Sequence, residues 1–390
     1  MESFDWIVVG NGLAGAVLSY ELACRDLKVL LLDDGSASSA TRCSYGGIAY
    51  WAAQDAMTKI LYREGIERHR QLEAELDSPT EFRELDLLLT FPPGVEGEQL
   101  LSTYSEVAIA PTLIDAATAQ ELEPQLSQTA VGGALTVKHG HVSPHKIVAA
   151  FNQAFRRRGG QHIIASVRGL VRIGNRVTGV LTPNQAYTAG SVAVCVGAYS
   201  RQLLKQARLS VPCLYSHAEL VKLEPMDTHL RAMIMPALAD RFGAEATAGD
   251  PDCRPLWQQP QGEIVPPVLD AGAIQFLDGT TYIGQISRFR AELEAAVDPD
   301  QSEAEIRQGI VSQLPCLADR PGQWFHTLVA FTSDGLPLVG PLPEVTGLHL
   351  FSGFSSPFAM VMPVARRFVQ ELDSAQSDEL VGAMAVDRQV

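Results

Sequence analysis

The sequence predicts an α/β fold in two parts: a parallel sheet with crossover helices, and a discontinuous α+β lobe built on an antiparallel sheet. Two observations predict it. A buried-strand pattern, a glycine turn, a helical pattern and a second buried strand follow one another within the first 35 residues. Farther on, short strand-like runs alternate with Pro-rich and Gly-containing turns. The 390 residues are enough for two such units.

The composition argues against several classes of protein. The formal net charge is −15, so we expect no nucleic-acid partner. The six cysteines form no CxxC or Cys/His cluster, which predicts reduced thiols and no metal site. The N-terminus MESFD is acidic, unlike a secretory signal, and the apolar run after it is interrupted by Asn11 and Glu21. We therefore expect a cytoplasmic protein without a transmembrane segment.

The first structural unit is a strand, a turn, a helix and a second strand. Residues 6–9 and 28–32 are short apolar runs typical of buried parallel strands. The turn reads GNGLAG, and the segment AVLSYELACR after it has apolar residues at helical spacing. This order predicts a Rossmann-like domain that binds a dinucleotide.

Each glycine of the turn has a physical role. Gly10 permits the tight turn, Gly12 lets backbone N–H groups approach a pyrophosphate, and Gly15 allows the helix to pack closely on the strand. The helix N-terminus adds unpaired donors and a partial positive charge. Asp33, after the second strand, is placed to accept hydrogen bonds from both hydroxyls of an adenosine ribose. The expected contacts of this unit are Gly10, Gly12, Leu13, Ala14, Gly15, Asp33 and Asp34.

A small, polar loop over residues 36–48 follows directly, reading SASSATRCSYGGI. Here the sequence resembles the D-amino-acid oxidase, glycine oxidase and sarcosine oxidase (DAO-like) family of FAD enzymes. In that family a Ser/Arg/Gly loop runs under the pyrophosphate and up to the flavin ring. The resemblance implies that FAD is the cofactor, bound noncovalently, although Cys43 is the nearest candidate for covalent attachment. The implied contacts from this loop are Ser39, Thr41, Arg42, Gly46 and Gly47.

Later stretches resemble the same family in the same order. They are Gly140–His145 with the long helix after it, Ile163–Val167, Val192–Ser200, Ser333–Pro341 and Gly347–Phe354. Ile163–Val167 resembles the strand whose last valine meets adenine. The final strand, turn and helix (348–351, 353–357 and 359–372) would direct helix N-terminal donors at the flavin pyrimidine edge. The contacts implied by these stretches are Val167, Cys195, Gly197, Gly335, Gly353, Phe354, Ser355 and Ser356.

The domain organisation follows from where the resemblance holds, roughly residues 4–215 and 325–372. We expect an FAD-binding domain from residues 1–85, 140–212 and 325–390, and a substrate-binding domain from residues 86–139 and 213–324. A surface helix is expected over 292–314, interrupted at Asp298-Pro299. The stretch 229–267 is longer than the family carries there, and is either a peripheral structural insertion, a lid or a partner-contact loop.

The resemblance also implies the chemistry. A small amine or amino acid loses hydride to flavin N5, the resulting imine hydrolyses, and O₂ or another acceptor reoxidises the flavin. Amino-acid members hold the substrate carboxylate with an arginine, and the aligned position here is Val329. A buried carboxylate without such a partner is costly, which places a simple amino-acid substrate in doubt. Arg42, Arg288 and Arg290 are the candidates to replace that arginine from elsewhere.

The candidate catalytic residues are Tyr45, His217 and His326. Tyr45 and Trp51 follow the flavin loop and are either walls of an aromatic pocket or plain core. His217 and Glu219 alternate on an expected strand and so share one face, where they either bind a polar substrate or form an ordinary polar surface. His326 is either a base or a satisfied histidine.

Three functions remain open at this stage. The first is an FAD-dependent oxidase acting on the C–N bond of a small amine or amino acid. The second is a dehydrogenase that passes electrons to a quinone or a protein carrier. The third is a flavin-binding protein with a regulatory role and no catalysis. The sequence also leaves an oligomer open.

Overall fold

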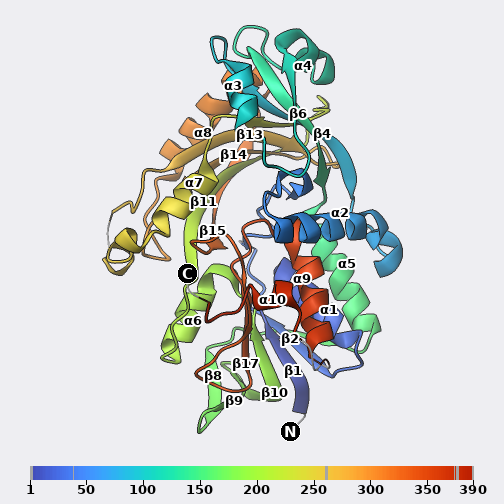
Figure 1. The fold of residues 1–390 in the computed structure, drawn as a ribbon, viewed down its shortest axis with the longest axis vertical. Helices are drawn as coiled ribbons and strands as arrows, with labels where there is room; N and C mark the ends of the chain where they lie inside the picture. The colour runs from blue at the N-terminus through green and yellow to red at the C-terminus, as the bar shows by residue number, and fades with distance from the viewer. Residues whose placement is uncertain (1–2, 38, 260–261, 373, 375–376, 389–390) are drawn as a thin grey trace.

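The computed structural model describes residues 3–37, 39–259, 262–372, 374 and 377–388 (Figure 1). Two sheets organise the chain, and the second one arches over the carboxyl end of the first. The chain passes between the two sheets four times, because β1 and β2, then β7 to β10, then β16 and β17 belong to the first sheet and the intervening strands to the second.

The first sheet is a doubly wound parallel sheet with an antiparallel edge. Its central order is β16-β17-β10-β1-β2-β7, with β17, β10, β1, β2 and β7 parallel to their neighbours and β8 and β9 forming a hairpin beside β10. The strands are β1 (Ser3–Val9), β2 (Val29–Asp33), β7 (Gln161–Ile164), β8 (Gly169–Ile173), β9 (Arg176–Leu181), β10 (Ala186–Val194), β16 (Leu338–Pro341) and β17 (Leu348–Ser352). The order reverses between β1 and β10, which is where open α/β sheets bind ligands.

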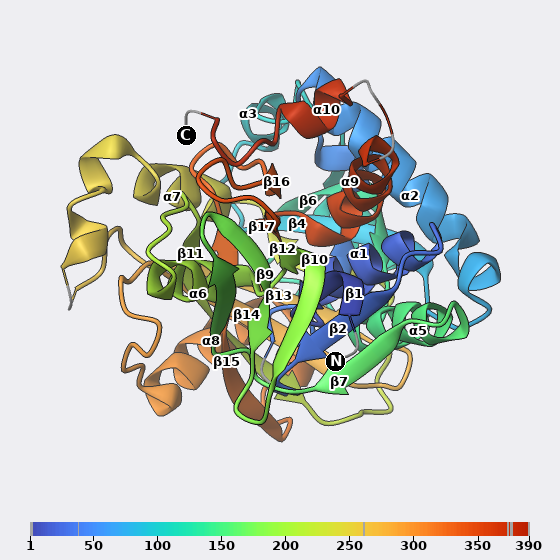
Figure 2. The same cartoon turned by 90° about the horizontal axis from the view of Figure 1, so that it is seen from below.

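Helices cover both faces of this sheet. The helices α1 (Leu13–Ala23), α5 (Pro144–Arg157) and α9 (Pro357–Glu371) lie together on one face, as Figure 2 shows from below. Trp6 and Val8 of β1 point into the core under these helices, whereas Ile7 and Val9 point into a second core with α6 (Ser200–Gln206). Burial on both faces explains why residues 6–9 are apolar without alternation.

The second sheet is mostly antiparallel, in the order β15-β11-β14-β13-β12-β4-β6-β3, with β5 beside β6 and one parallel pair, β12 and β4. Its strands are β3 (Gly47–Ile48), β4 (Arg83–Phe91), β5 (Thr112–Asp115), β6 (Gly133–His141), β11 (Leu214–Leu223), β12 (Met233–Pro236), β13 (Val268–Gln275), β14 (Thr281–Arg288) and β15 (Gly322–Phe331). This sheet confirms the expected antiparallel lobe and, with the first sheet, the α/β fold class.

The remaining helices pack around the two sheets. Helix α8 (Pro299–Gln313) lies across β11, β13 and β14 on the convex side of the second sheet (Figure 1). The others are α2 (Ala56–Leu76), α3 (Gly97–Ser102), α4 (Ala116–Leu122), α7 (Arg241–Ala248) and α10 (Glu379–Gly382). Within the described part of the chain, no helix combines the length and the apolar character needed to cross a bilayer.

The structure shifts some of the expected boundaries. Helix α8 begins at Pro299 rather than at residue 292, because the Asp298 side chain accepts hydrogen bonds from the Asp300 and Gln301 N–H groups and proline suits the first helical position. Strand β7 ends at Ile164, so Val167 lies in the loop beyond it. Strands β4 and β15 run through residues 85 and 325 while staying in the second sheet.

The stretch 229–267 divides into two parts. Its first part contains β12, which pairs with β4 and β13 inside the second sheet. Its second part contains α7 and two short helical turns, and Trp257 packs there against Tyr215 and Phe331 at ring-centroid distances of 5.6 and 6.4 Å. Residues 260 and 261 lie outside the described residues. Strand β12 and Trp257 therefore belong to the core, whereas Leu238, Phe242 and Leu256 are exposed.

Candidate active site

The glycine turn at the end of β1 is closed so tightly that two of its positions exclude a side chain. A Cβ atom on Gly15 would lie 1.8 Å from the Gly10 carbonyl oxygen. Gly10 has φ +101°, and a Cβ there would lie 2.6 Å from the carbonyl oxygen of Cys195, the first residue after β10. The turn therefore sits against the end of β10, at the point where the strand order reverses.

The N-terminus of α1 is left open by this turn. Gly12 occupies the N-cap and supplies no side-chain hydrogen bond. The Leu13 N–H donates to Thr41 Oγ1 at 3.0 Å, which ties the loop over residues 36–48 to the helix start. The Asn11 Oδ1 atom is shielded from solvent and has no hydrogen-bond partner among the described residues. Ala14 follows in the first turn, so the arrangement offers backbone donors to an anion.

Asp33 is the last residue of β2, and Asp34 is the first residue after it. The Asp33 carboxylate accepts hydrogen bonds from the Asn11 and Gly35 N–H groups, each at 2.8 Å. Two acceptor positions per oxygen leave it able to receive ribose hydroxyls as well. Asp34 is exposed and accepts from Ser36 N at 2.9 Å, which shapes the loop rather than the site.

The loop after Asp33 holds itself together through its own polar groups. The Arg42 N–H donates to Ser39 Oγ at 3.2 Å, and the Arg42 guanidinium donates to the Ser36 carbonyl at 2.6 Å. Gly46 has φ +69°, and a Cβ there would lie 2.1 Å from the Val142 carbonyl oxygen. Gly47 pairs with His141 of β6, which brings the end of this loop into the second sheet.

The other residues expected to contact the cofactor also lie near the carboxyl end of the first sheet. Gly197 begins a short helical turn after β10, and its carbonyl accepts a hydrogen bond from Ser352 Oγ at 3.2 Å. Gly353, Phe354, Ser355 and Ser356 lie between β17 and α9, and Gly335 lies in the turn between β15 and β16. The Val167 backbone lies beyond β7, where the neighbouring Ala165 N–H donates to the Asp33 carbonyl at 2.7 Å.

These features fit an FAD molecule. Helices α1 and α9 both begin without a side-chain cap. Each start lies beside a shielded polar atom that has no partner among the described residues, Asn11 Oδ1 at α1 and Ser355 Oγ at α9. The first start suits a pyrophosphate, and the second suits the electron-rich edge of a flavin. Residues 39–48 extend from the start of α1, where Thr41 accepts from the Leu13 N–H, to β3, which contacts α9.

The second sheet meets this loop with its concave face. Alternate residues show which face is which. Leu87, Met233, Ile274 and Tyr282 pack with Trp51 and Tyr45, whereas Leu88, Ile234, Ala273 and Ile283 pack with Ile306 and Ile310 of α8. The concave face is rich in aromatic side chains, with Tyr104, Phe276 and Phe325 also packed against it. It forms an apolar wall over the flavin loop.

Tyr45 crosses this concave face. Its hydroxyl donates to the Gly284 carbonyl and lies 3.4 Å from the Gly272 carbonyl. Burial raises the pKa of Tyr45 well above its usual value, and the Asp270 carboxylate raises it further. The phenol is therefore a fixed hydrogen-bond donor, and it ties the loop over residues 36–48, to which Tyr45 belongs, to the concave face of the second sheet.

The structure brings His217 and His326 together, but on the other face of the sheet. His217 Nδ1 lies 2.9 Å from His326 Nε2, and His217 Nε2 lies 2.9 Å from the Glu292 carbonyl oxygen. Because that carbonyl only accepts, neutral His217 carries its proton on Nε2 and receives one from His326. Burial lowers the pKa of both rings, that of His217 to about 4.

Glu219 fixes the side of the sheet to which the pair belongs. It is fully buried on the same strand face as His217, and Arg288 Nε donates to it at 2.7 Å. Arg288 also lies 3.9 Å from Glu305 of α8, and Val221 packs with Ile306. The pair therefore lies under the segment that leads into α8, on the opposite face from Tyr45 and Trp51.

None of the three arginines considered as carboxylate receptors projects from the concave face. Arg288 and Arg290 share Glu263 on the α8 side, at 3.5 and 3.1 Å. Arg42 lies in the flavin loop. Val329, where the family's arginine is expected, is half-buried on β15. The structure instead places Arg83 on the concave face, where it donates to His141 Nδ1 at 3.3 Å and to the Gln275 carbonyl.

Sequence reasoning missed two polar groups on the concave face, His139 and Asp270. His139 Nδ1 accepts a hydrogen bond from Trp51 Nε1 at 3.1 Å, so the neutral ring carries its proton on Nε2. That Nε2 has no partner among the described residues and lies 2.8 Å from the position of a Cβ on Gly47. The sequence did indicate that His139 lies on this face, because His139 continues the alternation of Leu135 and Val137 along β6.

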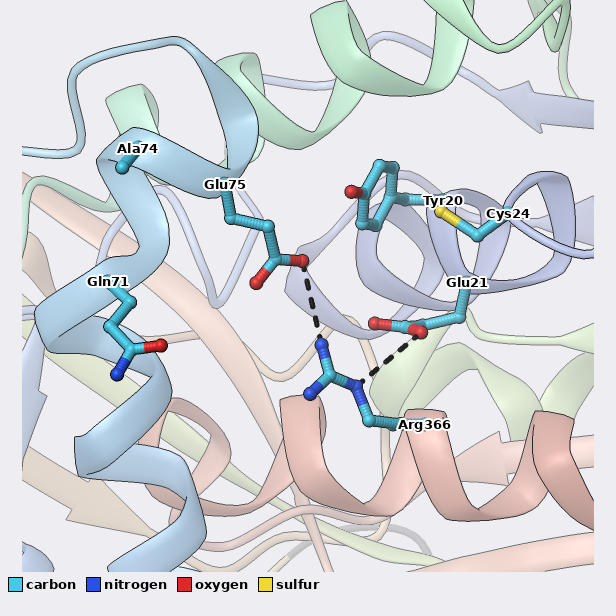
Figure 3. Close-up of a pocket in the computed structure, with 7 residues that line it drawn as sticks. All are labelled: Tyr20, Glu21, Cys24, Gln71, Ala74, Glu75 and Arg366. Atoms are coloured by element: carbon cyan, nitrogen blue, oxygen red, sulfur yellow. Dashed lines mark ion pairs between the residues drawn. The ribbon is translucent and has the colours of Figure 1, made fainter.

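A separate cavity of about 650 Å³ lies between α1, α2 and α9 (Figure 3). Arg366 reaches across it toward Glu21 and Glu75, at 4.0 and 3.7 Å. Tyr20 and Cys24 line it from the last turn of α1. It therefore lies at the opposite end of α1 from the glycine turn, and its charges serve the contact between the three helices.

Burial lowers the pKa of eight of the nine histidines, that of His69, His139, His217 and His349 to about 4 and that of His141 to about 3. From the ordinary value of 6.5 down to about 4, the unfolded chain therefore binds more protons than the folded one. We expect the free energy of unfolding to be level between about pH 7 and 8 and to fall below pH 6.5, by about 1.4 kcal/mol per pH unit for each histidine that stays neutral. The raised pKa values of Asp270 and Glu245 act in the opposite direction but concern two groups. Urea unfolding at several pH values measures this, and a stability that rises on acidification contradicts it.

Known proteins share these features. A family model described as FAD dependent oxidoreductase (DAO) matches residues 5–371. The oxidoreductase YurR of Bacillus subtilis is 23% identical over 371 residues, 90% of each chain. Glycine oxidase from Geobacillus kaustophilus has a TM-score of 0.80 at 17% identity over 100% of both chains. L-proline dehydrogenase from P. horikoshii has a TM-score of 0.76 at 17% identity, covering 98% of this chain and 97% of that one.

The match over almost the whole chain agrees with the cradle of Gly10, Gly12 and Gly15, the doubly wound sheet and the antiparallel lobe above it. The cofactor is FAD, and the protein is an oxidoreductase. The chain thus belongs to the DAO family of FAD-dependent oxidoreductases.

Proposed function

We propose that the protein oxidises the C–N bond of a small amine. The observation that carries this proposal is the aromatic concave face that meets the flavin loop at Gly47 without an arginine at position 329. When bound, FAD supplies the hydride acceptor, its N5. The chain binds the cofactor noncovalently at the glycine turn, since burial raises the pKa of Cys43 to about 11 and disfavours the thiolate that attachment requires.

The aromatic wall defines what the protein itself contributes. Tyr45 and Trp51 are held by hydrogen bonds to the Gly284 carbonyl and to His139, so their rings are fixed in place. Fixed apolar rings orient a substrate and exclude water, which leaves the amine free of strong stabilisation as an ammonium ion. Only the neutral amine has the lone pair that drives loss of hydride. We propose the lobe formed by residues 86–139 and 213–324 as the substrate-binding part.

Arg83 gives a second candidate function, oxidation of an amino acid whose carboxylate this guanidinium receives. It lies on the concave face, and burial lowers its pKa. Two of its donors are, however, already bound to His141 and to the Gln275 carbonyl. Oxidation of an amine without a carboxylate therefore agrees better with the described contacts.

Anaerobic bleaching of the bound flavin tests the proposal. We expect amines without a carboxylate to bleach it faster than the matching amino acids, by about tenfold or more in kcat/KM, because the latter bury an unpaired charge. Reoxidation of the reduced protein with O₂ or with a quinone then separates an oxidase from a dehydrogenase. Faster bleaching by amino acids supports the Arg83 alternative. Bleaching by dithionite but by no amine, amino acid or hydroxy acid favours a protein that binds flavin without catalysis.

A further inference from the structure

Asp270 is an acid on the concave face for which neither the fold nor the cofactor provides a use. It lies on β13 between Leu269 and Ala271, whose side chains lie 3.2 and 2.8 Å from the position of a Cβ on Gly309 of α8. A Cβ on Gly272 would meet Met235 of the concave face. The alternation of β13 therefore places Asp270 on the concave face, with Gly272 and Ile274.

Aromatic side chains share this part of the concave face. The Tyr45 hydroxyl lies 3.4 Å from the carbonyl oxygen of Gly272, two residues along β13, and Tyr104 packs against the same cluster. The negative charge of Asp270 helps to raise the pKa of both phenols, in agreement with this placement. The rings of Tyr104 and Trp51 are 6.0 Å apart between centroids. The corner between β13 and the loop after α3 thus combines one carboxylate with several aromatic rings.

No group of the described chain neutralises this acid. The Asp270 Oδ1 atom is shielded from solvent and has no hydrogen-bond partner among the described residues. The cation whose charge acts on Asp270 is Arg241, and Arg241 forms an ion pair with Glu245 one turn along α7. Burial raises the pKa of Asp270 to about 6, as expected for a carboxylate without a close partner.

A carboxylate that shares a concave face with aromatic rings is suited to an organic cation. An ammonium group donates a charge-assisted hydrogen bond to the carboxylate, and the ring faces attract its positive charge. The nitrogen that loses hydride must, however, be neutral. Holding that nitrogen at Asp270 would stabilise its protonated form and slow the reaction. The cation that suits Asp270 is therefore a second one, separated from the reacting C–N bond by an apolar spacer that fits the aromatic wall.

We propose that Asp270, with Tyr45 and Tyr104, receives a second, positively charged nitrogen of the substrate, so that the protein prefers diamines to monoamines and amino acids. This inference rests on the proposed function and names the substrate class of the same site. It also accounts for Val329, because a substrate with a cationic end requires no arginine at that position.

The test compares straight-chain α,ω-diamines with the monoamine and the ω-amino acid of the same length, by anaerobic flavin reduction with the holoenzyme. We expect kcat/KM for the diamine to exceed that for the monoamine by about tenfold or more, mostly through KM. Asp270→Asn should reduce this ratio by about tenfold. Asp240→Asn is the matched control, because it removes a nearby exposed charge that also acts on Tyr104 and asparagine still caps α7. In Asp240→Asn, the ratio of kcat/KM for the diamine to that for the monoamine should equal the ratio in the parent protein.

Binding of a cation that cannot be oxidised separates the two proposals. Titration with a bis-quaternary alkyldiammonium salt, whose nitrogens carry no N–H and are attracted by charge and ring faces alone, should perturb the flavin absorbance, and Asp270→Asn should weaken the apparent affinity by about tenfold. If no amine reduces the flavin but this binding depends on Asp270, the proposed oxidation fails and the cation site stands. Three results would overturn the inference. They are equal kcat/KM values for diamine and monoamine, an unchanged ratio of these values in Asp270→Asn, and an affinity for the alkyldiammonium salt that is the same in Asp270→Asn and in the parent protein.

Discussion

Gly12→Val is expected to give a folded protein that no longer holds FAD. Gly12 has φ −74°, which any residue adopts, and a Cβ there would lie 3.1 Å from Thr41 Oγ1, so the backbone tolerates the change. The added methyl groups nevertheless fill the space in which backbone donors approach the pyrophosphate. We expect the affinity for FAD to fall by about a hundredfold or more, equivalent to about 2.7 kcal/mol.

The ratio of flavin to protein absorbance after purification, and fluorescence titration of the apoprotein with FAD, measure this loss. Gly169→Val is the matched control, since nothing lies within 4 Å of a Cβ at that position, and it should bind FAD as the parent protein does. Gly15→Ala should instead disturb the fold, because its Cβ would meet the Gly10 carbonyl oxygen at 1.8 Å. A Gly12→Val protein that keeps its full flavin content would contradict the assignment of this turn.

Arg68→Met is expected to cause the largest loss of stability outside the cofactor site. Arg68 is buried between α1, α2 and α9, where it forms ion pairs with Glu21 and, at 2.7 Å, with Glu75, and donates to the Met362 carbonyl at 3.3 Å. Among the described residues, removing the guanidinium leaves the buried Glu21 carboxylate with Arg366 alone as a basic partner, at 4.0 Å. The free energy of unfolding should fall by about 3–5 kcal/mol.

Chemical denaturation of the holoenzyme measures this change. Arg366→Met is the matched control, because its side chain is 47% exposed and its ion pairs are 3.7 and 4.0 Å long (Figure 3). It should cost less than about 1 kcal/mol. Adding Glu21→Gln to Arg68→Met removes the unpaired charge and should recover part of the loss. Equal costs for the two arginine variants would refute this account.

The sequence was sufficient to predict the strand, glycine turn, helix start and second strand of the N-terminal unit because the pattern there is local. Gly10, Gly12, Gly15 and Asp33 act through a turn, a helix start and a strand end that are adjacent along the chain. The antiparallel lobe was also predictable from its short alternating runs. Alternation correctly places His217 and Glu219 on one face, but it does not say which face the flavin loop meets. That depends on where α8 packs, some 80 residues farther along the chain.

Asp270 and His139 were not predicted because each gains meaning from distant partners. Asp270 faces Tyr45 and Tyr104 only after β13 has taken its place in the second sheet. His139 was not predicted because it precedes the motif Gly140–His145, and its role depends on β6 continuing through residue 141. The contact with Trp51 makes the ring part of the wall.

The four passages of the chain between the two sheets limit how the molecule moves. A hinge normally bends at one or two flexible connections, whereas here four linkages would have to change direction together. One of these linkages is short, because only residues 332–337 connect β15 to β16. We therefore expect little rocking of one lobe against the other. Small molecules would then enter and leave through rearrangement of side chains and surface loops.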